Sequence, residues 1–217
     1  MKRILVVNPN STESCTEALA RAAAPFRRPD VEIVCETVAA GPQSVATMAD
    51  YAKAHGTLIE YFAARNDRVD AIVVACFSDP ALPAVREITG APCFGLGESG
   101  MMAAMLRGFR FGVVALAPAS VERQRRKAAE LGLGDRYAGS RPISLSVPEL
   151  AEGGKTVAAM IAAGRILKAD DGADVVVMGC AGMADYRAEL EDGIGLPVVE
   201  PGQAAVANAV AAALQGW

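Results

Sequence analysis

The chain has 217 residues and a formal net charge of −4, and 52% of its residues are hydrophobic although only 5% are aromatic. This length predicts one large domain or two small ones, and a charged fraction of 21% is too low for a disordered chain. Because acidic residues outnumber basic ones, the composition provides no basic surface for nucleic acid, and no such partner is expected.

Short apolar runs typical of buried parallel strands alternate along the chain with Ala-rich helical patterns. In chain order the patterns predict a strand at 3–8, a helix at 12–24, a strand at 31–37, a helix at 44–65, a strand at 71–75, a helix at 80–89, a strand at 93–96, a helix at 98–107, a strand at 111–116, a helix at 119–132, a strand at 143–147, a helix at 148–168, a strand at 175–178, a helix at 184–191, a strand at 198–199 and a helix at 202–214.

Local signals mark two of the helix starts and one helix surface. Asp79-Pro80 predicts an N-cap followed by a proline in the first helical position. Ser146-Val147-Pro148-Glu149 resembles a capping box. The basic run Arg123, Arg125, Arg126 and Lys127 is interpreted as the solvated face of its helix.

No targeting or membrane segment is expected from residues 1–10, because the apolar run 3–7 ends at Asn8-Pro9-Asn10. The chain has five cysteines and no CxxC spacing, which indicates free thiols in a reducing compartment. A cytoplasmic protein without a membrane partner is therefore expected.

The two halves of the sequence resemble each other. Asp70-Ala-Ile-Val-Val-Ala-Cys76 and Asp174-Val-Val-Val-Met-Gly-Cys180 match in hydropathy throughout, and each is followed by a helix and a strand led by proline. This repeat predicts an α/β fold of two similar doubly wound, four-stranded parallel-sheet domains related by a pseudo-twofold axis. The lobes are predicted at 1–98 and 99–201, with a hinge near 97–100 and the helix 202–214 packing back on the first lobe. The active site is expected in the cleft between them, beyond the carboxyl ends of the strands.

Cys76 and Cys180 occupy equivalent positions at strand ends, so facing domains would direct both sulfur atoms at one cleft. This arrangement suits removal of a proton from one face of a carbon and delivery to the other. Helix N-termini next to the thiols predict that their pKa falls below the free value of about 8.5. Cys15, Cys35 and Cys93 have no such pairing and are interpreted as packing residues.

Other types of site have little support in the sequence. His55 is the only histidine, so a catalytic triad or a histidine metal site is not expected, and we assign it a surface or half-buried role. Gly95-Leu-Gly97-Glu-Ser-Gly100 matches a dinucleotide-binding pattern but follows the fourth strand rather than the first, which favours a tight interdomain turn. The segment Asn8–Thr12 is suited both to capping the next helix and to binding a substrate oxygen.

Three segments together resemble the aspartate/glutamate/hydantoin racemase superfamily, and within it the hydantoin and allantoin racemases most closely. They are Asn8-Pro9-Asn10-Ser11-Thr12, Ala75-Cys76-Phe77-Ser78-Asp79-Pro80 and Gly179-Cys180-Ala181-Gly182-Met183. The resemblance implies a racemase that needs no cofactor or metal, with Cys76 and Cys180 as the two bases. It also implies a small-molecule substrate bound by Asn10, Phe77, Ser78, Ala181 and Gly182, and a homo-oligomer. Backbone N–H groups around Ser78 and Gly182, with Asn10, would stabilise the enolate oxygen.

The loop Ala115-Leu116-Ala117-Pro118-Ala119-Ser120 contains a single hydroxyl, whereas the amino-acid racemases of the superfamily usually carry more. This difference favours a neutral cyclic ureide, a 5-substituted hydantoin or allantoin, over aspartate or glutamate. The alternatives are an amino-acid racemase, an arylmalonate-type decarboxylase, a maleate cis–trans isomerase, and a non-catalytic ligand-binding module on the same scaffold.

Overall fold

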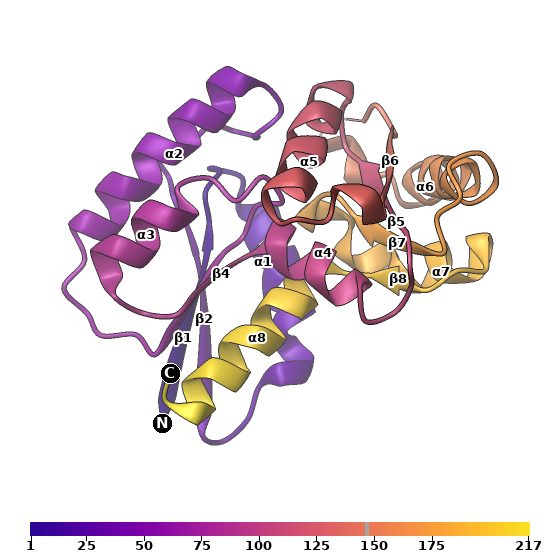
Figure 1. Cartoon of the computed structure of the whole chain (residues 1–217). Helices are drawn as coiled ribbons and strands as arrows, with labels where there is room; N and C mark the ends of the chain where they lie inside the picture. Colours follow the sequence, from indigo (N-terminus) through magenta and orange to yellow (C-terminus); the bar gives the residue numbers. More distant parts are fainter. Residues whose placement is uncertain (146–147) are drawn as a thin grey trace.

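The computed structural model describes residues 1–145 and 148–217, which form two four-stranded parallel sheets (Figure 1). The first has the order β2-β1-β3-β4 and contains β1 (Lys2–Asn8), β2 (Val31–Thr37), β3 (Ala71–Val74) and β4 (Cys93–Gly95). The second has the equivalent order β6-β5-β7-β8 and contains β5 (Phe111–Ala115), β6 (Tyr137–Pro142), β7 (Val175–Met178) and β8 (Val198–Val199). The predicted repeat of two α/β units is therefore confirmed.

Helices follow the strands, as a doubly wound fold requires. The α-helices are α1 (Glu13–Ala23), α2 (Met48–Ala63), α3 (Leu82–Thr89), α4 (Leu96–Ala104), α5 (Pro118–Glu130), α6 (Gly153–Ala169), α7 (Arg187–Ile194) and α8 (Pro201–Gln215). Short 3-10 helices are η1 (Ala24–Phe26), η2 (Gly134–Arg136), η3 (Pro148–Ala151) and η4 (Ala181–Tyr186). Within the described residues, no helix has both the length and the apolar character needed to cross a membrane.

Helices cover both faces of each sheet. Because successive strand residues point to opposite sides, neighbouring residues of one strand pack against different helices. On β1, Ile4 and Val6 pack against α1 and α8, while Leu5 and Val7 pack against α2 and α3. In the second sheet the residues of β5 and β7 likewise pack against α6 and α7 on one face and α4 and α5 on the other. The continuous apolar runs in the sequence reflect this two-sided burial.

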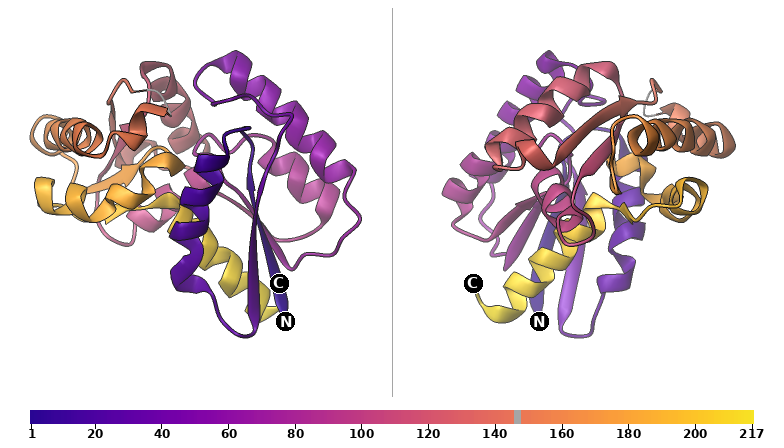
Figure 2. Two further views of the ribbon diagram at one scale, coloured as in Figure 1. Left: turned by 180° about the vertical axis from the view of Figure 1, so that it is seen from behind. Right: turned by 45° about the vertical axis from the view of Figure 1, so that its right-hand side comes forward.

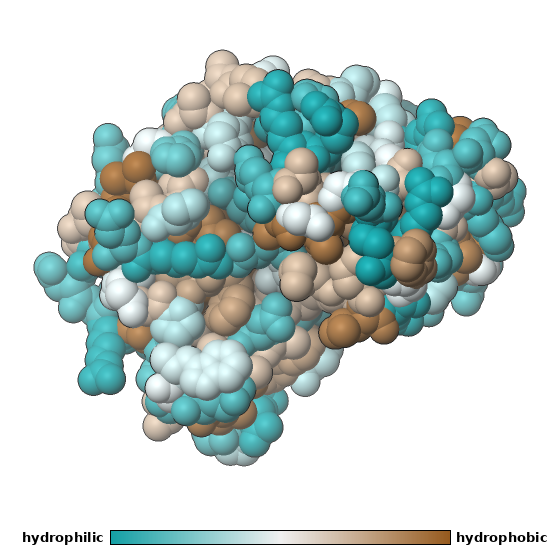
Figure 3. Space-filling view, viewed as in Figure 1, coloured by the Kyte–Doolittle hydropathy of each residue, from teal (hydrophilic) through white to brown (hydrophobic). Residues whose placement is uncertain are grey.

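The last helix connects the two units. In Figure 2, α8 leaves the second sheet and runs beside the first, ending near both termini of the chain. It contacts β1 and β3 and lies along α4. The division of the chain into lobes at residues 98 and 99 remains a prediction. On the face seen in Figure 3, hydrophilic side chains dominate and apolar ones gather in small separate groups.

The strand predicted at 143–147 is wrong, because the sixth strand is β6, over Tyr137–Pro142. It pairs only with β5 at the edge of its sheet, and all of its residues are half-buried, so it carries no continuous apolar run. Residues 143–145 follow it outside any strand. Ser146 and Val147, and with them the predicted capping box, lie outside the described residues.

The N-cap predicted at Asp79 is also wrong. Asp79 has a φ of 46°, Ala81 has a φ of 57°, and α3 starts only at Leu82. The buried Asp79 carboxylate instead accepts hydrogen bonds of 2.8 Å each from the N–H groups of Gly97 and Glu98. It therefore caps α4, and residues 97–100 form the first turns of that helix rather than an interdomain turn.

Gly97 has a specific packing role in this junction. A Cβ at this position would lie 2.2 Å from the backbone oxygen of Phe77 and 2.9 Å from the Asp79 carboxylate. Only glycine therefore allows α4 to approach the loop after β3 this closely. That loop carries Cys76, so the α4 junction helps to position the site described below.

Candidate active site

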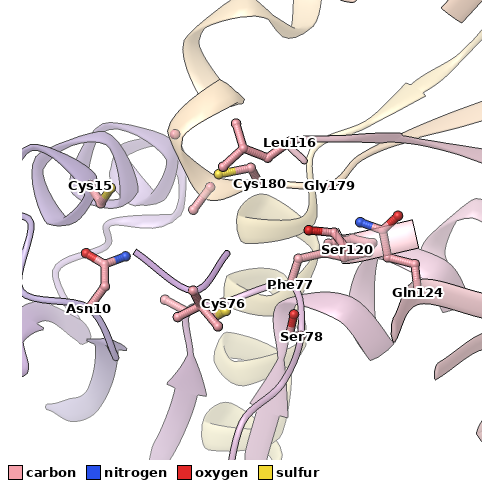
Figure 4. A pocket seen from close by; sticks show the side chains of 14 residues that line it. Asn10, Cys15, Cys76, Phe77, Ser78, Leu116, Ser120, Gln124, Gly179 and Cys180 are labelled. Atoms are coloured by element: carbon pink, nitrogen blue, oxygen red, sulfur yellow. The ribbon is translucent and has the colours of Figure 1, made fainter. Parts of the chain in front are cut away.

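A pocket lies where the carboxyl ends of the central strands of both sheets meet (Figure 4). The loops after β1, β3, β5 and β7 contribute Asn10, Cys76, Leu116 and Cys180 to its wall, and α5 contributes Ser120 and Gln124. The space inside it, with the open mouth included, is about 540 Å³. This is the edge at which parallel α/β sheets bind their ligands.

All of the residues that the sequence predicted for the site line this one pocket. They are Asn10, Cys76, Phe77, Ser78, Cys180, Ala181 and Gly182. The two thiols enter it from the two sheets, Cys180 from above and Cys76 from below in the view of Figure 4. The structure therefore brings the predicted residues together, and their chemical roles remain to be proposed.

The thiols are more basic than the sequence predicted. Burial is the main cause that raises the pKa of Cys76 from its ordinary 9.0 to about 11, and the negative charge of Asp79 contributes to this rise. Burial, with the neighbouring Cys15 thiol, raises the pKa of Cys180 to about 12. The expected lowering by helix N-termini is wrong because α3 begins only at Leu82 and Cys180 precedes a 3-10 helix. Both side chains keep partial exposure toward the pocket while lying deep in the protein.

Equivalent backbone donors serve the two sulfur atoms. The N–H of Ser78 hydrogen-bonds Cys76, and the N–H of Gly182 hydrogen-bonds Cys180, which opposes the rise in each pKa. Each donor lies two positions after its cysteine, so the sequence repeat extends to this contact. These groups stabilise a thiolate where one forms.

The segment after β1 orders Asn10 in the pocket wall, whereas Thr12, the N-cap residue of α1, makes no side-chain capping hydrogen bond, and substrate binding by this segment stays a prediction. The Asn10 side-chain oxygen accepts a hydrogen bond of 2.9 Å from the N–H of Thr12, the residue that precedes α1, and one of 3.2 Å from the buried Asn8 amide. This fixes the Asn10 side chain, and its nitrogen points toward the interior of the pocket in Figure 4. A hydrogen-bond donor is thus presented from the first sheet.

Sequence reasoning missed Arg123 as part of the surroundings of the site. Its guanidinium, on α5, donates 3.2 and 3.0 Å hydrogen bonds to the backbone oxygens of Val45 and Ala46, before α2. It also donates to Ser78 Oγ over 3.4 Å, and its positive charge lowers the pKa of Cys76. Arg123 therefore joins the second unit to the first beside a thiol.

The solvated-face interpretation of the basic run is correct for two residues and wrong for two. Arg125 and Arg126 are exposed and pair with Glu122, whereas the half-buried Arg123 and Lys127 face the first unit. Lys127 Nζ lies 3.7 Å from the Asp79 carboxylate. Their separation of four residues along a helix was the available signal, since such residues share a face.

Two smaller expectations have mixed outcomes. Cys15 is buried in α1 as predicted, but it also lines the pocket beside the other thiols. His55 is half-buried as predicted, and its Nδ1 accepts a 3.1 Å hydrogen bond from the N–H of Ala81. Among the described residues there is no group of three or more His, Cys, Asp or Glu side chains suited to a metal ion.

Comparison with known proteins agrees with this geometry. The family model for Asp/Glu/hydantoin racemase matches residues 4–209 of the chain. A hydantoin racemase of Paenarthrobacter aurescens is 32% identical over 206 residues, which cover 94% of this chain and 87% of that protein.

Two solved structures are similar in sequence and in fold. The allantoin racemase from Klebsiella pneumoniae has a TM-score of 0.91 and 30% identity, covering 100% of this chain and 89% of that one. The allantoin racemase from Pseudomonas fluorescens has a TM-score of 0.94 and 29% identity, covering 99% and 92% of the two chains.

Proposed function

Because the chain belongs to the Asp/Glu/hydantoin racemase family, and is therefore an isomerase of the racemase type, we propose that it racemises a cyclic ureide, namely a 5-substituted hydantoin or allantoin. Cys76 and Cys180 are the two bases of this proposal. The observation that carries it is the pair of thiols at equivalent strand ends, one from each sheet, lining a single pocket.

In one direction, Cys76 as thiolate removes the proton from the stereogenic carbon and becomes a thiol. Cys180, as thiol, delivers its own proton to the opposite face and becomes the thiolate. The reverse reaction exchanges these roles, so each turnover leaves one thiol and one thiolate. Each proton transfer contributes roughly 10²–10⁴-fold to the rate. The N–H groups of Ser78 and Gly182 stabilise whichever sulfur carries the charge.

Charge in the lining supports a neutral substrate. No Lys, Arg or His is among the described residues that line the pocket. The guanidinium of Arg123, beside the pocket, already donates hydrogen bonds to three backbone oxygens and to two serine hydroxyls. The α-carboxylate of aspartate or glutamate, or the two carboxylates of a malonate or maleate, would lack a cationic partner there. A ring bearing only carbonyl and N–H groups fits this lining better.

Proton exchange in D₂O tests the proposal. An enantiopure 5-substituted hydantoin or allantoin should take up deuterium at the stereogenic carbon while its optical rotation is lost. Turnover of a malonate, a maleate or an amino acid, with no exchange into any ureide, would contradict the proposed substrate class.

Substitution of the thiols tests the mechanism. Cys76→Ser and Cys180→Ser should each abolish racemisation, since serine is far too weak an acid to share the proton transfers. Cys35→Ser is the matched control, because Cys35 lies on β2 and is not among the residues that line the pocket. Full activity in either pocket variant would exclude two-base catalysis. A wild type that binds a ureide without turning it over, together with the same ligand affinity in Cys76→Ser and Cys180→Ser, would instead favour a binding module.

A further inference from the structure

Gln124 is a buried polar residue to which the proposed proton transfers assign no role. It lies on α5, its residue is 4% exposed, and it lines the pocket. Its side-chain oxygen accepts a hydrogen bond of 2.5 Å from the Ser140 hydroxyl on β6. Ser140 Oγ also lies 2.5 Å from the Tyr137 hydroxyl. The single hydroxyl hydrogen of Ser140 is donated to Gln124, so Tyr137 is the donor to Ser140. These two hydrogen bonds fix the orientation of the Gln124 amide.

The amide nitrogen of Gln124 is directed the other way. In Figure 4 it faces Ser120 and the pocket while the oxygen faces away. Among the described residues, this nitrogen has no hydrogen-bond acceptor. Every fully buried side-chain nitrogen or oxygen atom in the described part of the chain has a partner, so the Gln124 nitrogen is not fully buried. The NH₂ group is therefore open to the pocket and available to a ligand.

The Gln124 amide nitrogen lies beside Gly179, the residue before the proposed base Cys180. A Cβ at Gly179 would lie 3.0 Å from Gln124 Nε2, so the glycine leaves room for the amide immediately before Cys180. One helical turn earlier, Ser120 Oγ accepts a hydrogen bond of 3.3 Å from Arg123, which leaves the hydroxyl hydrogen of Ser120 free to donate. The wall formed by α5 thus presents two donors whose acceptor atoms are already engaged.

We propose that Gln124 is a specificity-determining residue that donates a hydrogen bond from Nε2 to a ring carbonyl oxygen of the substrate. This inference rests on the proposed function, because a cyclic ureide is the ligand that carries such an oxygen on a small ring. Tyr137 and Ser140 are positioning residues that hold the amide in place. A site built to satisfy a carbonyl rejects a ligand that lacks it, since the buried donor is then left unpaired.

Binding of 5,5-dimethylhydantoin separates recognition from catalysis, because this compound has no proton at C5 and cannot be racemised. Calorimetry should give a Kd about 10- to 100-fold higher for Gln124→Met than for the wild type, as expected for loss of one buried hydrogen bond. Methionine keeps the length of the side chain. Gln124→Asn, which withdraws the NH₂ group by one methylene, should also weaken binding and serves if the methionine variant does not fold. Gln215→Glu, exposed at the end of α8, is the control expected to bind normally.

The outcomes distinguish this inference from the proposed function. If the wild type binds no hydantoin and exchanges no ureide proton, the proposed function fails and the inference with it. If the wild type binds 5,5-dimethylhydantoin and a folded Gln124→Met or Gln124→Asn variant binds it equally well, only the role of Gln124 is overturned. Comparison with the 2-thio and 4-thio analogues gives an independent check. Sulfur is a weak acceptor, so one analogue should bind the wild type at least tenfold less tightly than the parent, and this penalty should vanish in Gln124→Met.

Discussion

Replacing Cys76 with serine should make the protein less sensitive to unfolding at alkaline pH. In the folded protein burial raises the pKa of this thiol from 9.0 to about 11. Above pH 9 the unfolded chain therefore loses the proton first, and the folded state binds more protons than the unfolded one. Stability contributed by the neutral thiol is complete below pH 9 and is lost as the pH rises toward 11.

The size of this effect follows from the two pKa values. At pH 10, one unit above the unfolded value and about one below the folded value, the difference in proton binding favours unfolding by about a factor of 10, or about 1.4 kcal/mol. At pH 7 the contribution is close to zero because both states are protonated. The wild type should thus lose about 1.4 kcal/mol more than Cys76→Ser between the two pH values.

Urea unfolding of both proteins at pH 7 and pH 10 measures this difference directly, because ionisation of the other cysteines and of the tyrosines is common to the two chains. Cys180→Ser should show a similar difference, since the pKa of Cys180 is raised to about 12. Equal losses of stability in wild type and variant would refute the reasoning. The Ser78 N–H and the Arg123 charge would then balance the effect of burial, and the thiol would ionise near its ordinary pKa.

Two substitutions test the junctions around the site. Gly97→Ala should lower the free energy of unfolding in urea by about 1–3 kcal/mol and reduce activity, because the added Cβ meets Phe77 and Asp79. Gly56→Ala is the control: nothing lies within 4 Å of its Cβ, so it should leave stability unchanged or raise it. Arg123→Met removes charged hydrogen bonds between the two units and should cost about 1.5–3 kcal/mol in the same assay, whereas unchanged stability would show that the bridge contributes nothing.

Local patterns predicted much of the fold. The apolar run that became β3 and its counterpart β7 are buried on both faces, so each strand has a signal of its own. The edge strand β6 has no such signal, because its half-buried residues Tyr137–Pro142 depend on pairing with β5 for their conformation. Its position was accordingly predicted several residues too late.

The sequence alone determined which residues would meet. Equivalent cysteines at equivalent strand ends can be read without coordinates, because parallel sheets bring the ends of their central strands to one edge. Tertiary structure alone decided the state of those thiols and the partners of Asp79, Arg123 and Gln124. The pKa of a buried group and the acceptor of a buried donor depend on atoms brought close by packing, and these atoms lie far away along the chain.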